Sequence, residues 1–135
     1  MNKKPKLIRW QKSLTKDQRE PADVLEDFVQ AWADRDFVTM IAKSQISWID
    51  LIERSYESVV EKLDSMFNAK PIKIRFVEHE FVSNVAFRVV TVVTVQIARG
   101  IEKSLSRDVR VICEEGPLNP SPEGKWGVNP QSIQV

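Results

Sequence analysis

Residues 21–40 of the 135-residue chain read PADVLEDFVQAWADRDFVTM. Apolar side chains recur in its first half at the spacing of one helical face: Leu25, Phe28, Val29 and Trp32. Pro21 suits the first helical position, because the first turn of a helix needs no backbone N–H from it. Arg35 and Asp36 interrupt the stripe, and the Asp36 carboxylate can cap a second helix. The stretch therefore predicts a helix, a short break and the start of another helix.

Downstream of this stretch, the pattern stays helical as far as Pro71. Ser47 and Ser55 are plausible helix N-caps, and residues 56–67 keep apolar side chains at helical spacing. The segment 48–54 between them is apolar at several positions, and we interpret it as a helix rather than a short strand. The first half of the chain is therefore predicted to be helical.

Beyond Pro71 the spacing of the apolar residues changes from that of a helix to every second residue, which is typical of strands. Ile72, Ile74 and Phe76 share one face, and the phase then slips at Val77, which predicts a β-bulge. Further strands are expected over 86–99, 105–113 and 126–135, with Pro130 at a bulge or edge in the last one. Helices followed by four long antiparallel strands indicate an α+β domain, with the helices packed on one face of a strongly curved sheet.

Composition excludes several classes of protein. Charged residues make up 29% and hydrophobic residues 42% of the chain, which are ordinary values for a globular domain. A single cysteine, Cys113, excludes an internal disulfide framework and a multi-cysteine zinc site, and its apolar surroundings predict a buried small side chain rather than a reactive thiol. We expect neither a metal nor a cofactor. No apolar run approaches a membrane span and no secretory signal is evident, so we expect a cytoplasmic protein.

The charges are distributed unevenly along the chain. Residues 1–20 hold seven basic and two acidic side chains, a net charge of +5, whereas residues 21–135 hold 13 basic and 17 acidic ones, a net charge of −4. We therefore divide the chain into a basic N-terminal arm, 1–20, and a single domain, 21–135. Leu7, Trp10 and Leu14 fall on one helical face, so the arm is expected to dock on the domain or a neighbouring subunit. The domain is expected to fold without it. Contact with nucleic acid or an anionic membrane is the alternative use of the arm.

Two motifs resemble those of a known superfamily. The segment VLEDFVQAWADRDFVTM, residues 24–40, resembles the opening helix motif of the nuclear transport factor 2-like superfamily, which has a cystatin-like cone fold. The segment GKWGVNPQSIQV, residues 124–135, resembles its terminal strand. The resemblance covers residues 21–135 and is nearest in character to small bacterial members of unknown role. It implies a cone-shaped cavity between the helices and the concave sheet face.

In some members of this superfamily that cavity is a catalytic pocket, and in others it is filled or binds a small molecule. The candidate pocket-lining residues are aromatic side chains on the apolar stripes: Trp32, Trp48, Tyr56, Phe76 and Trp126. No catalytic residue stands out, because each candidate base has a simpler role. His79 fits strand polarity, Asp34 and Asp36 fit a helix boundary, and Asp108 points away from the apolar face of its strand.

The sequence therefore favours a non-catalytic binding or assembly module, which engages a protein partner or a small apolar ligand through the sheet face or the cone cavity. The alternative is an isomerase or lyase that acts on a hydrophobic cyclic substrate in the cone. An enzyme of this kind would need an open cavity with a buried ionisable group in it.

A homodimer is expected because the strand 86–99 is apolar on both faces. Val90 and Val92 point away from the helices, and Ile112 joins them if the next strand pairs in register. If this patch stayed in water, each side chain would lose the roughly 1.5–3 kcal/mol that its burial contributes. Contiguous apolar patches of this kind usually mark an interface. Arg88, Thr94 and Arg110 would form the polar rim of the two-fold contact.

Overall fold

A computed structural model describes residues 6–52 and 55–135 of the chain. The helices of this part are α1 (Arg19–Asp34), α2 (Phe37–Ala42), α3 (Ile46–Ile52), α4 (Tyr56–Met66) and α5 (Pro130–Ile133). The strands are β1 (Ile8–Trp10), β2 (Lys70–Ser83), β3 (Ala86–Ala98), β4 (Ile101–Gly116), β5 (Asn119–Pro120) and β6 (Lys125–Val128). This order confirms the predicted α+β class, with the helices of the first half preceding the long strands.

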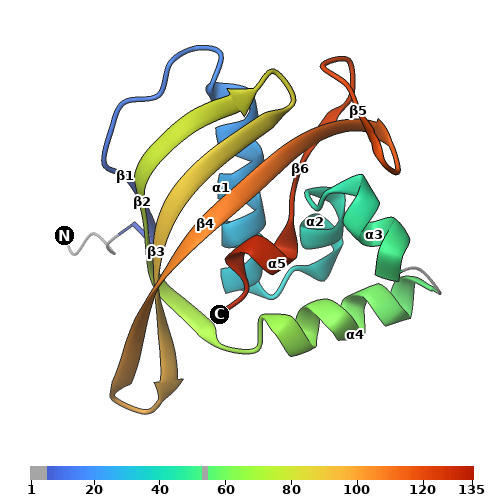
Figure 1. Cartoon of the computed structure of the whole chain (residues 1–135). Helices are drawn as coiled ribbons and strands as arrows, with labels where there is room; N and C mark the ends of the chain where they lie inside the picture. The colour runs from blue at the N-terminus through green and yellow to red at the C-terminus, as the bar shows by residue number, and fades with distance from the viewer. Residues whose placement is uncertain (1–5, 53–54) are drawn as a thin grey trace.

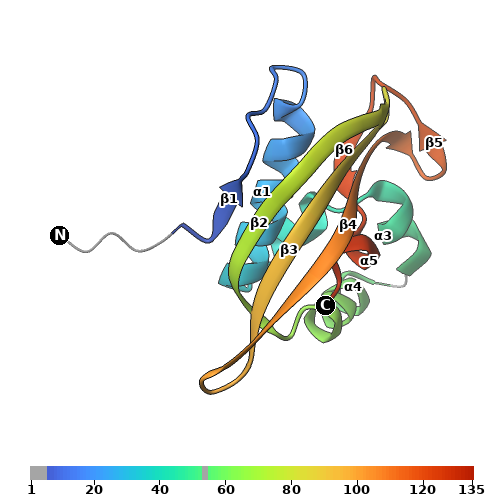
Figure 2. The same cartoon turned by 60° about the vertical axis from the view of Figure 1, so that its left-hand side comes forward.

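The strands form a six-stranded sheet in the order β1-β2-β3-β4-β5, and β6 also pairs with β4. β1 runs parallel to β2, and the other pairs are antiparallel. The helices lie against one face of the sheet, and Figure 2 shows the opposite face uncovered in the described part of the chain (Figures 1 and 2). The β3–β4 hairpin extends past the helices at the bottom of Figure 1.

The sheet twists without curling strongly, so the prediction of a strongly curved sheet is wrong. Three register shifts interrupt the pairing of β2 with β3, including the predicted bulge between Phe76 and Glu78. The pairing of β3 with β4, in contrast, runs without a shift from Ala86 to Gln96. Because a bulge bends the strand that carries it, the shifts in this pairing bend β2.

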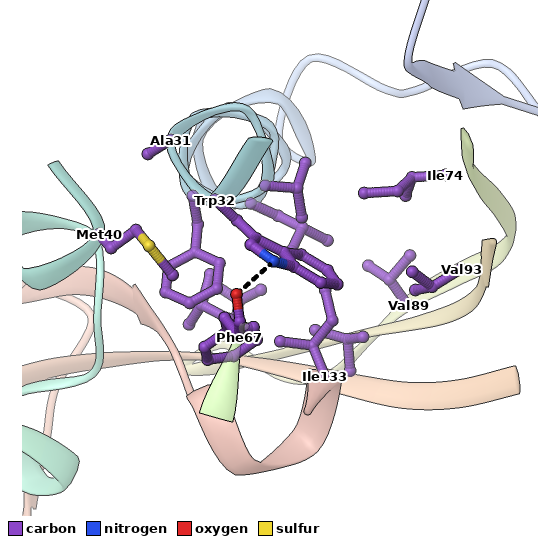
Figure 3. Packing of buried hydrophobic residues seen from close by; sticks show 14 of the residues in the cluster. Ala31, Trp32, Met40, Phe67, Ile74, Val89, Val93 and Ile133 are labelled. Atoms are coloured by element: carbon purple, nitrogen blue, oxygen red, sulfur yellow. Dashed lines mark hydrogen bonds between the residues drawn. The ribbon is translucent and has the colours of Figure 1, made fainter. Parts of the chain in front are cut away.

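The predicted apolar stripe of α1 is confirmed and lies at the centre of the core. Leu25, Phe28, Val29 and Trp32 are at most 1% exposed. Figure 3 shows the Trp32 indole pointing from α1 toward the sheet, near Phe67, Val89 and Ile133. The helix begins at Arg19, two residues before Pro21, and ends at Asp34; the next residue, Arg35, caps it in the left-handed conformation (φ 57°).

Two predicted helix caps are confirmed and a third is wrong. The Asp36 carboxylate accepts the Thr39 N–H (3.1 Å) at α2, and the Ser55 hydroxyl accepts the Ser58 N–H (3.1 Å) at α4. Ser47 lies inside α3 rather than before it, and its N–H donates to the buried carboxylate of Glu114 (3.0 Å). The acceptor for this N–H at the start of α3 is therefore Glu114 of β4. Because β4 is distant in sequence, the residue spacing around Ser47 does not reveal this contact. Residues 53–54 of the predicted segment 48–54 lie outside the described residues.

The predicted last strand over 126–135 is confirmed only in its first part. β6 ends at Val128, and residues 130–133 form the short helix α5. The Asn129 side chain accepts the Gln131 N–H (3.1 Å), and Pro130 occupies the first turn. An Asx cap followed by proline starts a helix, and this local signal overrides the alternating apolar pattern.

Within the described part of the arm, residues 8–10 form the strand β1 rather than the predicted helix. Ile8, Arg9 and Trp10 pair with Ile74, Arg75 and Phe76 of β2. The Trp10 ring packs on Phe76 (centroids 4.2 Å apart), and its indole N–H donates to the Glu26 carboxylate of α1. The apolar residues of the arm therefore dock on the domain, as predicted, but through a strand. Residues 1–5, which include Lys3 and Lys4, lie outside the described part.

The uncovered face of the sheet separates the three residues of the predicted dimer face. Val90 pairs with Asp108 and Val92 with Ser106, whereas Ile112 pairs with Ala86. Arg88 and Arg110 form the row between Ile112 and the two valines. The two valines are half-buried neighbours, but Ile112 does not extend their patch.

Candidate ligand-binding pocket

The space between the helices and the sheet, where the superfamily resemblance implies a cavity, is filled by side chains. Its large members are fully buried: Phe28, Trp32, Phe67, Phe76 and Phe87. The Trp32 indole N–H donates to the carbonyls of Phe67 (3.1 Å) and Ala69 (2.9 Å), which locks the ring in place (Figure 3). The interior of the domain is thus a packed core at this point.

A pocket of about 560 Å³ opens at the surface beside this core. Three segments distant in sequence line it: the turn before α1, the β2–β3 turn, and β6. Its lining residues are Lys16, Asp17, Glu20, Phe81, Ser83, Asn84 and Trp126. We call this cavity the aromatic pocket; its volume is in the range of small-molecule sites.

Two aromatic rings form the apolar wall of the aromatic pocket. Phe81, the last inward-facing aromatic residue of β2, lies 6.1 Å from Trp126 between ring centroids, with the planes inclined by 49°. On its other side Phe81 packs on Phe87 (5.1 Å), a buried residue of β3. Trp126 lies on β6, where it pairs with Cys113 of β4, and this strand pairing holds its position. The wall is therefore an extension of the core that is reached from outside mainly at Phe81 (37% exposed), since Trp126 is only 8% exposed.

The charged rim of the pocket is held by a reciprocal pair of hydrogen bonds. The Thr15 hydroxyl accepts the Gln18 N–H (3.3 Å), and the Gln18 side-chain carbonyl accepts the Thr15 N–H (3.0 Å). This is the capping-box arrangement that precedes a helix. It fixes the turn that carries Lys16 and Asp17, and Glu20 follows in the first turn of α1.

Two carboxylates on this rim have no cationic partner. Among the residues that the structure describes, no ion pair involves Asp17 or Glu20. Burial raises the pKa of the Cys113 thiol, and the negative charge of Glu20 raises it further. The electrostatic effect of Glu20 therefore reaches Cys113, the β4 residue that pairs with Trp126. The rim has two acids and one base, Lys16, which makes it net negative.

His79 lies on the helix side of β2, in the same phase as Phe81, because the bulge at Phe76–Glu78 shifts the strand pattern. Its ring lies 5.5 Å from Trp10 and 6.1 Å from Phe87, and the backbone carbonyl of Lys12 lies 3.4 Å from its Nε2. Nδ1 is buried and has no hydrogen-bond partner in the described part. Of the two roles expected for His79, a structural or a surface histidine, its surroundings fit the structural one. His79 is a packed residue beneath the arm and does not line the aromatic pocket.

The structure places the five candidate pocket-lining residues in three different environments. Trp126 lines the aromatic pocket. Trp32, Trp48 and Phe76 belong to the buried core, and Tyr56 is half exposed at the start of α4. The pattern of the sequence did not single out the residues of the pocket rim. The Thr-Lys-Asp-Gln spacing at residues 15–18 was the available signal, since it marks a helix start.

Each of the remaining candidate acids forms a hydrogen bond or an ion pair within the fold. Asp36 caps α2, and hydrogen bonds from the Thr39 side chain and backbone N–H hold its pKa below the ordinary value. Asp34 accepts from the Gln30 amide (3.2 Å), and Asp108 pairs with Arg88 (2.9 Å) and Arg110 (3.4 Å) on the uncovered sheet face. Within residues 6–52 and 55–135, no three His, Cys, Asp or Glu side chains gather closely enough to hold a metal ion.

A second, smaller groove of about 340 Å³ lies between α2, α3 and the β4–β5 turn. Ile41, Ile46 and Ile49 are among its lining residues, with Pro117 on the turn. The next residue, Leu118, is 86% exposed and has a left-handed backbone (φ 57°). Its N–H donates to the Ser47 hydroxyl (2.8 Å), which itself donates to Glu114, so a buried network holds this turn.

Comparisons with known proteins identify the fold only. No protein-family model matches the chain, and no curated protein matches it significantly. The solution structure of a SEC-C motif containing protein from Rhodopseudomonas palustris is similar, with a TM-score of 0.55 and 13% sequence identity. The match covers 89% of this chain and 92% of that protein. At this identity the likeness concerns the α+β fold and carries no activity. No described helix is long and apolar enough to cross a membrane.

Proposed function

We propose that this protein is a non-catalytic binding module that takes a small, largely apolar ligand in the aromatic pocket and assembles as a homodimer. The aromatic wall of the pocket, which is exposed mainly at Phe81 and backed by Trp126, carries the proposal. Aromatic side chains exposed in a concave site supply large apolar contact area, whereas the neighbouring polar groups fix the orientation of a ligand. The filled centre of the domain supports a ligand at this surface pocket rather than inside the fold.

The alternative, an isomerase or lyase, has less support from the geometry. Such an enzyme would need a general base within reach of a bound substrate. His79 is not among the pocket-lining residues, and the carboxylates of Asp17 and Glu20 are on exposed residues of the rim. These features favour binding without chemistry.

Titration with the neutral fluorescent probe N-phenyl-1-naphthylamine tests the pocket. We expect saturable binding with one site per chain, because the probe is apolar and its two ring systems fit a pocket of this size. Phe81→Ala should weaken that binding by about tenfold, which corresponds to about 1.4 kcal/mol. Val82→Ala is the matched control, since Val82 is exposed on the same strand but does not line the pocket.

Two results would contradict the pocket assignment. One is equal binding of the probe by the Phe81→Ala and Val82→Ala variants. The other is loss of binding in an Ile49→Ala variant only, which would place the probe in the groove between α2 and α3. Circular dichroism of each variant checks that the fold is retained.

Homodimerisation through the uncovered sheet face is supported by its charge pattern. Along β2, Lys73 and Arg75 face outward before the bulge, and Glu78 and Glu80 face outward after it. Their neighbours on β3 are Thr94, Val92, Val90 and Arg88, in that order. Two such faces can pack on each other about a two-fold axis that lies in the plane of the interface. If this axis runs perpendicular to the strands and passes between Val90 and Val92, it brings Val92 against the partner's Val90. The same axis brings Arg75 toward the partner's Glu78, so the face is self-complementary.

We also propose that the fold is a divergent member of the nuclear transport factor 2-like superfamily. The order of helices before long antiparallel strands, and the bulge in the first long strand, support this assignment. The sheet is less curled than the cone of that superfamily, which agrees with a filled centre. Under this proposal the binding site has moved from the interior of the cone to the aromatic pocket at one end.

A further inference from the structure

We propose that the ligand of the aromatic pocket is an organic ammonium ion, whose apolar body contacts Phe81 and Trp126 and whose positive charge faces Asp17 and Glu20. The inference rests on the proposed function and adds the chemical class of the ligand. It depends on two features that occur together in this cavity: an accessible aromatic wall and two carboxylates without a cationic partner.

The aromatic wall favours a cation because the face of an aromatic ring carries partial negative charge. A cation within about 6 Å of a ring centroid gains roughly 0.5–2 kcal/mol from this interaction. Phe81 and Trp126 lie 6.1 Å apart and are inclined by 49°, so a single small cationic group can lie near both rings. An anion would meet the same ring faces with repulsion.

The rim carboxylates add to this preference. Some described acids already have a cationic partner, as Glu78 has in Lys12 (2.7 Å) and Asp23 has in Arg19 (3.6 Å). Asp17 and Glu20 have no such ion pair among the described residues, although Lys16 lies beside them. Their charges therefore remain available to a ligand. The Thr15–Gln18 hydrogen bonds hold Asp17 in position before the ligand arrives, which reduces the entropy lost on binding.

The other side chains of the pocket suit the remainder of such a ligand. Ser83 and Asn84 in the β2–β3 turn offer hydroxyl and amide groups at the mouth. A pocket of about 560 Å³ accommodates an alkyl or aryl group together with the ammonium group. We therefore exclude large polymeric ligands and consider small molecules only.

Titration with benzyltrimethylammonium chloride, followed by tryptophan fluorescence and by NMR of the Trp126 indole, tests the inference. Benzenesulfonate is the oppositely charged comparison compound of similar size. We expect the ammonium ion to bind at least tenfold more tightly than benzenesulfonate. Its affinity should fall when NaCl is raised from about 20 to 500 mM, because salt screens an attraction between exposed charges.

The double variant Asp17→Asn/Glu20→Gln should lose at least fivefold in affinity for the ammonium ion and keep its affinity for N-phenyl-1-naphthylamine. Asp23→Asn is the matched control: it removes one carboxylate from the same helix outside the pocket, and should leave ammonium binding within twofold. Lys16→Gln should strengthen ammonium binding, since it removes the single base of the rim.

The outcomes separate the two proposals. If the neutral probe binds at Phe81 but the ammonium ion binds no better than benzenesulfonate, the ammonium inference is wrong and the proposed pocket stands. The same conclusion follows if the double variant binds the ammonium ion as tightly as the unmodified protein. If neither probe responds to Phe81→Ala, both proposals fail.

Discussion

Trp32 is the side chain on which the packing between α1, α4 and the start of β2 depends. Its indole ring is buried and its N–H donates to two carbonyls, those of Phe67 and Ala69. Trp32→Phe removes this donor and leaves a small void. We expect the free energy of unfolding to fall by about 2–3 kcal/mol, from the lost volume and the lost bond to the Ala69 carbonyl, whereas the Phe67 carbonyl keeps its bond from Arg35 (2.6 Å). Urea denaturation measures this change.

Tyr56→Phe is the control for that measurement, because Tyr56 is half exposed and its substitution also removes one polar atom from an aromatic side chain. Its effect should stay within about 0.5 kcal/mol. Equal stability of the Trp32→Phe variant and the unmodified protein would show that the core tolerates the loss of this indole.

Asp36 is expected to make the stability of the protein depend on pH below about 4. Hydrogen bonds from Thr39 hold its pKa in the folded state below that of an unfolded aspartate. Such a group stabilises the fold fully above the unfolded pKa of about 3.9 and loses this contribution as the pH falls through the folded pKa. Asp36→Asn keeps a capping oxygen but cannot titrate. The difference in Tm between the unmodified protein and the variant should therefore be larger at pH 7 than at pH 3; a difference that is constant over this range would contradict the assignment.

The strand β1 makes the N-terminal arm part of the folded domain in a way that charge alone did not predict. Trp10 covers Phe76, which is fully buried, and bonds to Glu26 of α1. Trp10→Ala should therefore lower the free energy of unfolding by about 2–3 kcal/mol, somewhat less than for a fully buried tryptophan. Arg9→Ala, on the opposite face of the same strand, is the matched control. A Trp10→Ala variant as stable as that control would restore the view of the arm as a dispensable segment.

The junction between α3 and β4 depends on a buried carboxylate. Glu114 is 2% exposed and accepts from the backbone N–H and the hydroxyl of Ser47, which in turn accepts the Leu118 N–H. Ser47→Ala keeps the backbone N–H bond to Glu114 but removes the hydroxyl, which leaves the second carboxylate oxygen and the Leu118 N–H without this partner. We expect a loss of about 1–3 kcal/mol in urea denaturation, since unsatisfied buried groups keep their desolvation penalty. Ser104→Ala on the exposed part of β4 is the control, and equal losses in the two variants would argue against a special role of the network.

The unmodified protein is expected to sediment as a dimer at micromolar concentration. Val92→Arg should yield monomers, because it would bury an unpaired charge against the partner's apolar surface. A monomeric unmodified protein would overturn the proposed interface.

The orientation of that interface has its own test. Arg75→Glu places like charges opposite each other across the proposed axis and should raise the dimer dissociation constant about tenfold. Adding Glu78→Arg restores opposite charges and should recover the dimer. If the double variant dissociates at least as readily as the single one, the two sheets pack in another register.

Features that depend on neighbours in sequence were predictable from the chain alone. The stripe of α1, the caps at Asp36 and Ser55 and the bulge after Phe76 follow from side-chain periodicity and local hydrogen bonding. The α+β class follows from the change in period at Pro71. The burial of Cys113 in the core follows from the apolar run around it. Within the candidate site, only the aromatic character of Trp126 gave such a signal.

Features that depend on contacts between distant segments were decided by the tertiary structure. A three-residue strand such as β1 is too short to show a period, and it forms because β2 offers an edge and Phe76 an apolar surface. The filled centre depends on the volumes of side chains that helices and strands from the whole described chain bring together. The aromatic pocket joins residues 16–20, 81–84 and 126, and no local pattern records that these segments meet. Local energies select helices and strands, whereas the location of the pocket results from the long-range packing that places those elements side by side.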